Sequence, residues 1–175
     1  MGKVEKRDFI SNCYFNLIRM KIRKARLDDL KRIDEIYTGG SIDEGKLQFP
    51  SVTINEMIKN LKKFKKNRIN GWKKELKSKN NYWIVLEDNK FILGFGNAEI
   101  KKNYGHNEGM CTMTYIDRRF RRKGFGFRIT KELVSWLKKQ KVKHIEAGFY
   151  YNNLPSIEMC RKLGFKPISL KMRLY

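Results

Sequence analysis

RRKGFG, residues 121–126, stands between a predicted strand and an amphipathic helix. The helix is indicated by apolar residues that recur at helical spacing, namely Ile129, Leu133, Trp136 and Leu137. A glycine-containing loop that opens a helix directs several backbone N–H groups to one point, where the positive end of the helix dipole also lies. The hexapeptide therefore predicts an anion site, because Gly124 and Gly126 let the backbone approach a phosphate closely.

The pattern before this loop excludes a classical dinucleotide-binding fold. Period-two alternation predicts three consecutive strands at 82–87, 91–100 and 109–116, the first two joined by a turn at 88–90. Gly94 and Gly96 in the second strand suggest a bulge or a close backbone approach. No parallel crossover precedes the loop and the third glycine of the G-x-G-x-x-G fingerprint is missing, so the loop follows a meander instead.

The rest of the chain supplies helices and further strands. A strand from Met20 leads into a helix whose stripe ends before Gly39, and two helices are predicted between Ile54 and Leu76 with a break near Asn70–Gly71. After the amphipathic helix we expect a strand at 144–150, a short helix ending at Gly164, and a last strand at 167–175. These elements predict an α/β (α+β) domain over residues 20–175, a mixed and mostly antiparallel sheet of six or seven strands flanked by helices. Residues 1–19 are expected to be an extension.

Composition narrows the class of protein. The chain has 175 residues, enough for one core, and no apolar run long enough for a membrane helix or a signal peptide, so a cytoplasmic protein without membrane contact is expected. Its three cysteines lack metal-type spacing and no metal site is predicted.

Charge is the extreme feature of the composition. Forty Lys and Arg residues against 18 Asp and Glu give a net charge of +22. The excess is consistent with a partner such as nucleic acid or an acidic protein, or with compositional bias alone. The lysine-rich segment 54–79 fits a solvated helix face and a docking surface equally well.

Two segments resemble signatures of the GNAT superfamily. Residues 116–126 are similar to its pattern V-x-P-x-[YF]-[RQ]-x-x-G-x-[GA], and residues 153–165 to N-x-x-[AS]-I-x-x-Y-x-x-x-G-F. The order and separation of the two also match, and the resemblance covers about residues 20–175. It implies direct transfer of an acetyl group from acetyl-CoA (coenzyme A) to an amine on a small molecule or protein, by a monomer or homodimer.

The resemblance also implies which residues bind the cofactor. The backbone of residues 114–116 would pair with the pantetheine arm, and the loop through Phe127 would hold the pyrophosphate. The full predicted set is Thr114, Tyr115, Ile116, Arg121, Arg122, Lys123, Gly124, Phe125, Gly126, Phe127 and Asn153.

The catalytic groups depart from the superfamily pattern. Cys160 stands where a tyrosine often protonates the leaving thiolate, and it is interpreted either as a thiol donor or as a buried packing residue. Met110 occupies the position where some members have a glutamate base, so Glu108 and Glu146 rank equally as candidates, with Glu99 third. These departures keep open a rival function, a catalytically weak module on the same scaffold that binds nucleic acid or an acidic partner.

Overall fold

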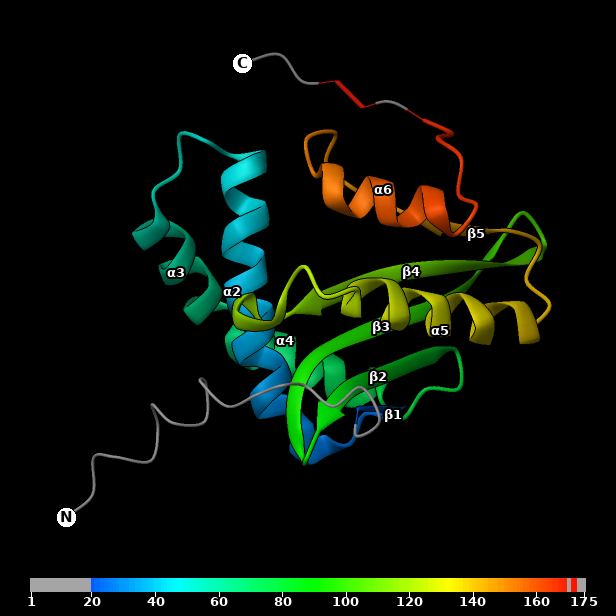
Figure 1. Ribbon diagram of the computed structural model, residues 1–175, viewed down its shortest axis with the longest axis horizontal. Helices are drawn as coiled ribbons and strands as arrows, with labels where there is room; N and C mark the ends of the chain where they lie inside the picture. The colour runs from blue at the N-terminus through cyan, green and yellow to red at the C-terminus, as the bar shows by residue number, and fades with distance from the viewer. Residues whose placement is uncertain (1–19, 170, 173–175) are drawn as a thin grey trace.

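The computed structural model describes residues 20–169 and 171–172. Within these residues five strands form one sheet in the order β1-β2-β3-β4-β5 (Figure 1). Neighbours from β1 to β4 are antiparallel, and β5 runs parallel to β4. The strands are β1 (Lys21–Lys24), β2 (Asn81–Asp88), β3 (Phe91–Asn103), β4 (His106–Ile116) and β5 (Ile145–Ala147). The predicted mixed, mostly antiparallel sheet with flanking helices is confirmed.

The sheet has fewer strands than the sequence suggested. The described part of the expected last strand, residues 167–169 and 171–172, contains no strand, and the strand expected at 144–150 shortens to β5. Ile168 is 76% exposed and Met172 is 85% exposed. The apolar residues that suggested a strand therefore have no buried face within the described chain. The expected extension, residues 1–19, lies outside the described residues.

Helix α2 (Leu30–Gln48) is longer than the helix predicted there and follows a short 3-10 turn, η1 (Leu27–Asp29). It continues through Gly39 and Gly40, where the sequence suggested an end. The ring of Tyr115 explains Gly40, because a Cβ atom at that position would lie 2.1 Å from its Cδ1. Gly40 thus permits close packing of helix and strand and does not terminate the helix.

Two helices follow, as predicted, but the break lies elsewhere. Helix α3 (Ile54–Lys63) begins with a capping box between Thr53 and Glu56, and α4 (Lys65–Glu75) starts directly after Phe64. Gly71 lies inside α4 next to the buried Trp72. Packing of that indole against the sheet keeps the glycine helical, so the expected break near Gly71 was wrong.

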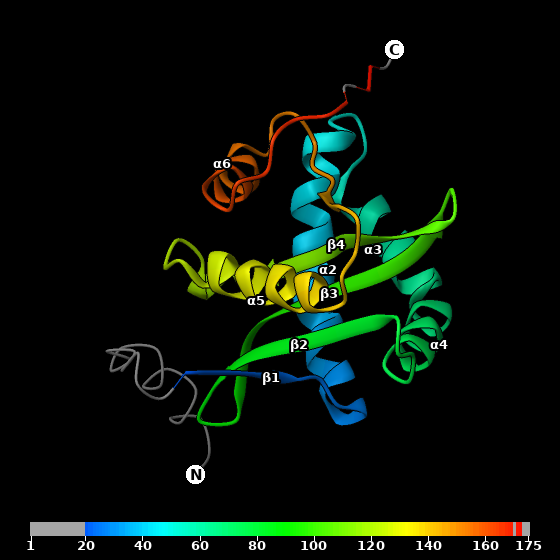
Figure 2. The same ribbon diagram turned by 90° about the vertical axis from the view of Figure 1, so that its right-hand side faces the viewer.

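The sheet separates two apolar cores. Helix α5 (Phe125–Lys139) covers one face, and α2 with α4 covers the other (Figure 2). The α5 side buries Ile84, Leu86 and Leu93 from the sheet against Ile129, Leu133 and Leu137. The α2 side packs Trp83, Val85 and Phe95 against Leu30, Ile33, Ile36 and Trp72. No helix within the described residues is long and apolar enough to cross a bilayer.

Two β-bulges shape the meander. Leu86 pairs with Gly94 and Glu87 with Ile92, so Leu93 is an extra residue beside the glycine that suggested a bulge. Asn97 pairs with Met113 and Ala98 with Cys111, which makes Thr112 a second extra residue. Because a bulge shifts the alternation of side chains, Cys111 packs toward the α5 core whereas Met113 packs toward the α2 core.

Candidate active site

The sheet opens at one place between β4 and β5. Their parallel pairing covers only Gly109 to Cys111 on β4 and ends where Cys111 meets Ala147. Beyond that point the chain from Gly148 leads away to α6 (Leu154–Lys162), which lies beside α5 (Figure 1). On the side of β5, the edge of β4 from Thr112 to Ile116 therefore has no strand next to it among the described residues.

A cavity of about 340 Å³ fills this opening. Residues from β4, α5, α6, α2 and the segment after β5 surround it. They are Glu44, Cys111, Thr112, Met113, Thr114, Tyr115, Thr130, Ala147, Gly148, Phe149, Tyr150, Ser156, Met159 and Cys160. The cavity begins where the pairing of β4 with the short β5 ends, next to the bulge at Thr112.

The predicted anion loop lies between β4 and α5. It contains a short 3-10 turn, η2 (Arg118–Phe120), and then Arg122 and Gly124 with φ of 63° and 76°. Gly124 is the N-cap of α5, and no side chain in the described chain caps it. The first N–H groups of any α-helix have no acceptor inside the helix. This end of α5 is therefore suited to an anion from outside the helix.

Space for a ligand exists at both glycines of the loop. A Cβ at Gly124 would meet no atom of the described chain within 4 Å, and one at Gly126 would meet only Met159 Sδ, at 3.3 Å. Gly124 also needs its left-handed conformation, which disfavours any side chain. The loop thus satisfies the steric requirement of a phosphate cradle.

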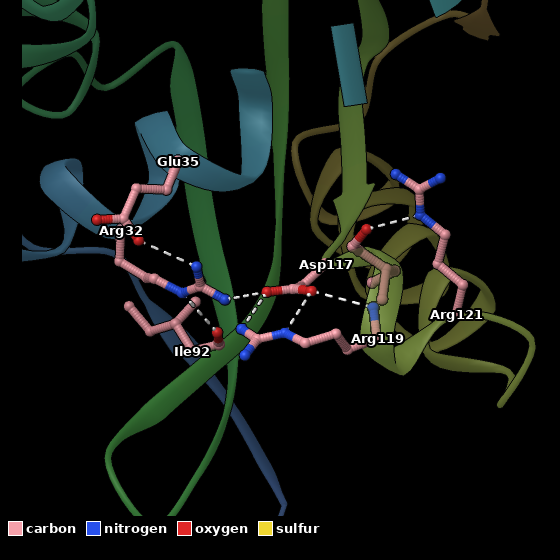
Figure 3. A network of polar contacts seen from close by, with 7 residues as sticks. Arg32, Glu35, Ile92, Asp117, Arg119 and Arg121 are labelled. Atoms are coloured by element: carbon pink, nitrogen blue, oxygen red, sulfur yellow. Dashed lines mark hydrogen bonds and ion pairs between the residues drawn. The ribbon is translucent and has the colours of Figure 1, made fainter. Parts of the chain in front are cut away.

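Asp117 anchors the start of the loop (Figure 3). It accepts hydrogen bonds from Arg32 of α2 and, at 2.7 Å, from Nη2 of Arg119. Burial alone would raise the pKa of Asp117, but the hydrogen bonds from these arginines outweigh it and hold the pKa far below its usual value. The contact between Asp117 and Arg32 ties the loop to α2.

Asp43 of α2 holds two more loop arginines. Its carboxylate accepts from Arg118 Nε at 2.9 Å and from Arg121 Nη1 at 2.8 Å, while Arg121 Nε donates to the carbonyl oxygen of Ile116 at 2.9 Å. Burial would raise the pKa of Asp43, but these arginines keep it low. The side chain of Arg121, predicted to bind the cofactor, is thus directed to α2 and to the end of β4.

Of the other predicted cofactor residues, the structure brings two to the cavity and places others elsewhere, with Phe125 buried in the α5 core. Thr114 and Tyr115 line it, and Oγ1 of Thr114 lies 3.2 Å from Oγ1 of Thr130 on α5. Ile116 instead packs into the α5 core. Asn153 starts α6, with its carbonyl oxygen accepting from the N–H groups of Ser156 and Ile157, both at 3.1 Å.

Cys160 faces the cavity from α6, together with Cys111 of β4. Burial raises the pKa of Cys160 to about 11. Burial, and next the charge of Cys160, raises the pKa of Cys111 to about 12. Both thiols therefore stay protonated near neutral pH. Within the described residues, no group of three or more His, Cys, Asp and Glu side chains is arranged to hold a metal ion.

The two glutamates predicted as bases lie at the closed end of β4. His144 Nε2 is 3.3 Å from Glu108 Oε1 and 3.5 Å from Glu146 Oε1, and Asn103 also donates to Glu108. The third candidate, Glu99, pairs with Lys101 at 2.6 Å. None of the three glutamates is among the described residues that line the cavity.

Glu44 is a cavity residue that sequence reasoning missed. Its Oε2 accepts a hydrogen bond of 2.5 Å from the hydroxyl of Tyr115. Burial, followed by the negative charge of Glu44, raises the pKa of Tyr115 far above its ordinary value. The helix was expected to end before Gly39, so Glu44 was never placed on it. The spacing of Tyr37, Ser41 and Glu44 was the available signal, because it continues one helix face.

The lysine-rich surface is separate from the cavity. Helices α3 and α4 expose Lys59, Lys62, Lys63, Lys66, Lys73 and Lys74, none of which belongs to the described cavity lining. Lys65 differs from them, since it pairs with Asp34 at 2.8 Å. The solvated-face and docking interpretations of this surface both remain predictions.

Comparison with known proteins addresses the fold and the family. The chain is similar to PaiA N-acetyltransferase from Thermoplasma acidophilum in complex with coenzyme A, with a TM-score of 0.72 and 15% identity over 87% of this chain and 92% of that one. For a GCN5-related N-acetyltransferase from Ralstonia eutropha JMP134 the values are 0.70 and 12%, over 89% and 98%. For glucosamine-6-phosphate N-acetyltransferase from Arabidopsis thaliana they are 0.55 and 21%, over 89% and 97%. At these identities the solved structures establish a shared fold.

The family of the chain is identified from its sequence. A comparison with curated proteins gives no match. The family model described as "Acetyltransferase (GNAT) family" matches residues 52–165, well over half of the chain. The matched segment contains the meander, the loop at the start of α5, the opened edge of β4 and the whole of α6. The chain therefore belongs to the acetyltransferase (GNAT) family.

Proposed function

We propose that this protein is an N-acetyltransferase that moves an acetyl group from acetyl-CoA directly to an amine. Acetyl-CoA is the cofactor of the family and supplies the activated acetyl thioester. One observation carries the proposal: the unpaired edge of β4 lines the cavity, and Met159 of the same lining is the nearest neighbour of Gly126 in the first turn of α5. A long ligand with a phosphate group and an amide-bearing arm fits this arrangement.

The residues of the site match the chemical groups of that cofactor. Backbone N–H groups at Gly124 to Phe127 would hold the pyrophosphate, because they lie at the positive end of the α5 dipole. The β4 edge at Thr114 and Tyr115 would pair with the amides of the pantetheine arm, as an added strand does. Arg122 and Lys123 would add positive charge at the same end of α5, whereas Arg121 would act by holding the loop on Asp43.

The proposal assigns Cys160 a packing role. Its thiol, with a pKa of about 11, is a weaker acid than an unperturbed thiol with a pKa of about 8.5. Proton transfer from Cys160 to a departing thiolate would therefore be uphill. The buried thiol forms part of the α6 wall of the cavity.

Gly126→Val tests the cofactor site. The added side chain projects into the space beside α5, where only Met159 is close, so folding should persist while the ligand is blocked. We expect acetyl-CoA affinity, measured by titration calorimetry, to fall at least tenfold. Gly124→Val is less clean, because the left-handed backbone strains any side chain there.

Gly71→Val provides the matched control. Gly71 is also helical, and a Cβ there would contact nothing within 4 Å in the described chain, but α4 contributes no residue to the cavity. This variant should bind acetyl-CoA as the parent does. Equal affinity of folded Gly126→Val and Gly71→Val would contradict the proposed site. Transfer itself is measured by release of free thiol in the presence of an amine.

A further inference from the structure

We infer that Glu44 forms the acceptor subsite, where it binds a primary amine that carries one positive charge and an apolar substituent, and that it removes the proton from that amine. This inference rests on the proposed acetyl transfer. It assigns the base to a residue on α2 rather than to Glu108 or Glu146.

Glu44 lies in the lining of the cavity. Of the described residues that line the cavity, Glu44 alone carries a carboxylate. The neighbouring Asp43 is committed to Arg118 and Arg121 and does not line the cavity. In a protein with a net charge of +22, a carboxylate facing a cavity without a cation among its described lining residues is a specific site for a cationic group.

Tyr115 holds this carboxylate in place. Its hydroxyl donates to Glu44 Oε2, while its ring packs on Gly40, 5.6 Å from the ring of Tyr37 and 5.7 Å from that of Phe95. The ring therefore has little freedom to turn. Tyr115 is a positioning residue, because it orients one oxygen of Glu44 and leaves the other for a ligand.

The surroundings of Glu44 define the rest of the acceptor. Phe149 and Tyr150 line the cavity and remain 40% and 37% exposed, and Leu47, one turn beyond Glu44 on α2, is 40% exposed. Asn152 Nδ2 donates to the carbonyl oxygen of Leu47 at 3.3 Å and so links the segment after β5 to α2. This apolar rim beside a single carboxylate suits a monocation with an aliphatic or aromatic group, and the described part of the lining offers no second acid for a polyamine.

The reaction balances with Glu44 as base. The ammonium group gives one proton to the Glu44 carboxylate, and the freed nitrogen lone pair forms a bond to the acetyl carbonyl carbon. The carbon–sulfur bond then breaks with its electron pair on sulfur, and the second nitrogen proton passes to that sulfur. The proton held by Glu44 returns to water, so the products are the acetylamide, free CoA thiol and one proton.

Other titratable groups face Glu44 from every side of the cavity. They are Tyr115 and Cys111 from β4, Tyr150 from the segment after β5 and Cys160 from α6, with Asp43 and its two arginines beside Glu44 on α2 and the loop. Burial raises the pKa of Tyr115, Cys111 and Cys160, so these three groups stay protonated at neutral pH. The charge that a cationic acceptor meets in the cavity is therefore that of Glu44.

Glu44→Gln is the direct test, with Glu146→Gln as the matched control of equal chemistry outside the cavity. For Glu44→Gln we expect kcat to fall by about 10²- to 10⁴-fold, the usual contribution of a general base, while acetyl-CoA affinity stays within twofold. The rise of kcat/KM with pH should also move toward the pKa of the free amine, which a purely structural change would not cause. Glu146→Gln should leave all three quantities unchanged.

Two pairs of amines test the substrate class. Phenethylamine and methylamine differ in the apolar group, and we expect phenethylamine to have at least a tenfold higher kcat/KM. Butylamine and putrescine have the same chain, but putrescine has a second ammonium group, and butylamine should be preferred. Preference for methylamine or putrescine would overturn the assigned substrate class.

The outcomes separate this inference from the proposed function. If the wild-type protein binds no acetyl-CoA, the proposed function fails. If it binds acetyl-CoA but transfers acetyl to none of the four amines, the assigned substrate class fails. If it transfers normally and Glu44→Gln does too, only the assignment of Glu44 fails. If Glu146→Gln is the impaired variant, the base lies at the closed end of β4.

Discussion

The two ends of β4 differ in their surroundings: one end lies in a cluster of paired side chains, and the other borders the cavity. At the closed end, Gly109 to Cys111 pair with β5, and the nearby Glu108 and Glu146 share His144. At the open end, beyond Thr112, the strand has lost β5 and borders a cavity with Glu44. Carboxylates at the closed end have protein partners, whereas Glu44 has a protein partner on one oxygen and a cavity before it.

The bulge at Thr112 coincides with this difference. The extra residue shifts the alternation of β4, and the pairing with β5 ends at the preceding residue, Cys111. An acidic residue on the closed half of β4, such as Glu108, can therefore be close to the open half in sequence and still not line the cavity. The number of residues between a candidate base and the loop therefore does not predict the distance of that base from the cavity.

The adjacent glycines of α2, Gly39 and Gly40, provide a pair of variants that test the open end of β4. A Cβ at Gly40 would enter the ring of Tyr115, whereas one at Gly39 would meet nothing within 4 Å in the described chain. Gly40→Ala should lower the free energy of unfolding by about 2 kcal/mol and reduce kcat more than tenfold, because Tyr115 must move away from Glu44. Urea unfolding and the free-thiol assay measure the two effects.

Gly39→Ala is the internal control for that experiment. It should stabilise the protein by up to about 1 kcal/mol through helix propensity and leave turnover unchanged. If both alanine variants retain full turnover, the position of Tyr115 does not matter for catalysis. The two ends of β4 would then differ in shape but not in their effect on turnover.

Asp117→Asn tests the residue that anchors the loop directly after the open end of β4. Losing the charge weakens the contacts with Arg32 and Arg119, so we expect the free energy of unfolding at pH 7 to fall by about 2 kcal/mol. The pKa of Asp117 is depressed in the folded state, so its contribution is present above an unfolded pKa of about 4 and is lost as pH falls toward the folded value. The difference between variant and wild type should thus be constant from pH 7 to 5 and shrink below about pH 4. A constant difference down to pH 3 would exclude this electrostatic origin.

The smallest effect is expected at the closed end. His144→Gln removes a partner of Glu108 and Glu146, but its side chain is 44% exposed, and exposed pairs contribute at most about 1 kcal/mol. Unfolding free energy should change by less than that, and kcat by less than twofold. A large loss of turnover would assign these glutamates to the reaction after all and reverse the comparison.

Local patterns of the sequence were sufficient for most of the fold. The alternation at 82–116 predicted the meander, and Gly124 with the stripe from Ile129 predicted the loop and α5, because each depends on residues close in the chain. The end of α2 and the break at Phe64 were misplaced, because tertiary contacts of Gly40 and Trp72 override the glycine signals there.

The site was predictable only where a contiguous motif defines it. The loop and Cys160 lie within the two signatures, and Thr114 and Tyr115 were expected from the same resemblance; the last three line the cavity, while their roles stay predictions. Glu44 did not, since it meets Tyr115 across 71 positions of the chain, and that contact depends on the continuation of α2 through two glycines. The bulge at Thr112 is likewise set by pairing with β3, which no spacing in β4 alone reveals.

Asp43 and Glu44 are consecutive residues of α2 that contact different parts of the molecule. Asp43 holds Arg118 and Arg121 of the loop that precedes α5, while Glu44 faces the cavity through Tyr115. Any ligand that steadies the loop therefore also steadies the turn that bears Glu44. In kinetic terms, this linkage favours a compulsory order of binding, in which the first ligand at the α5 end completes the pocket for the second.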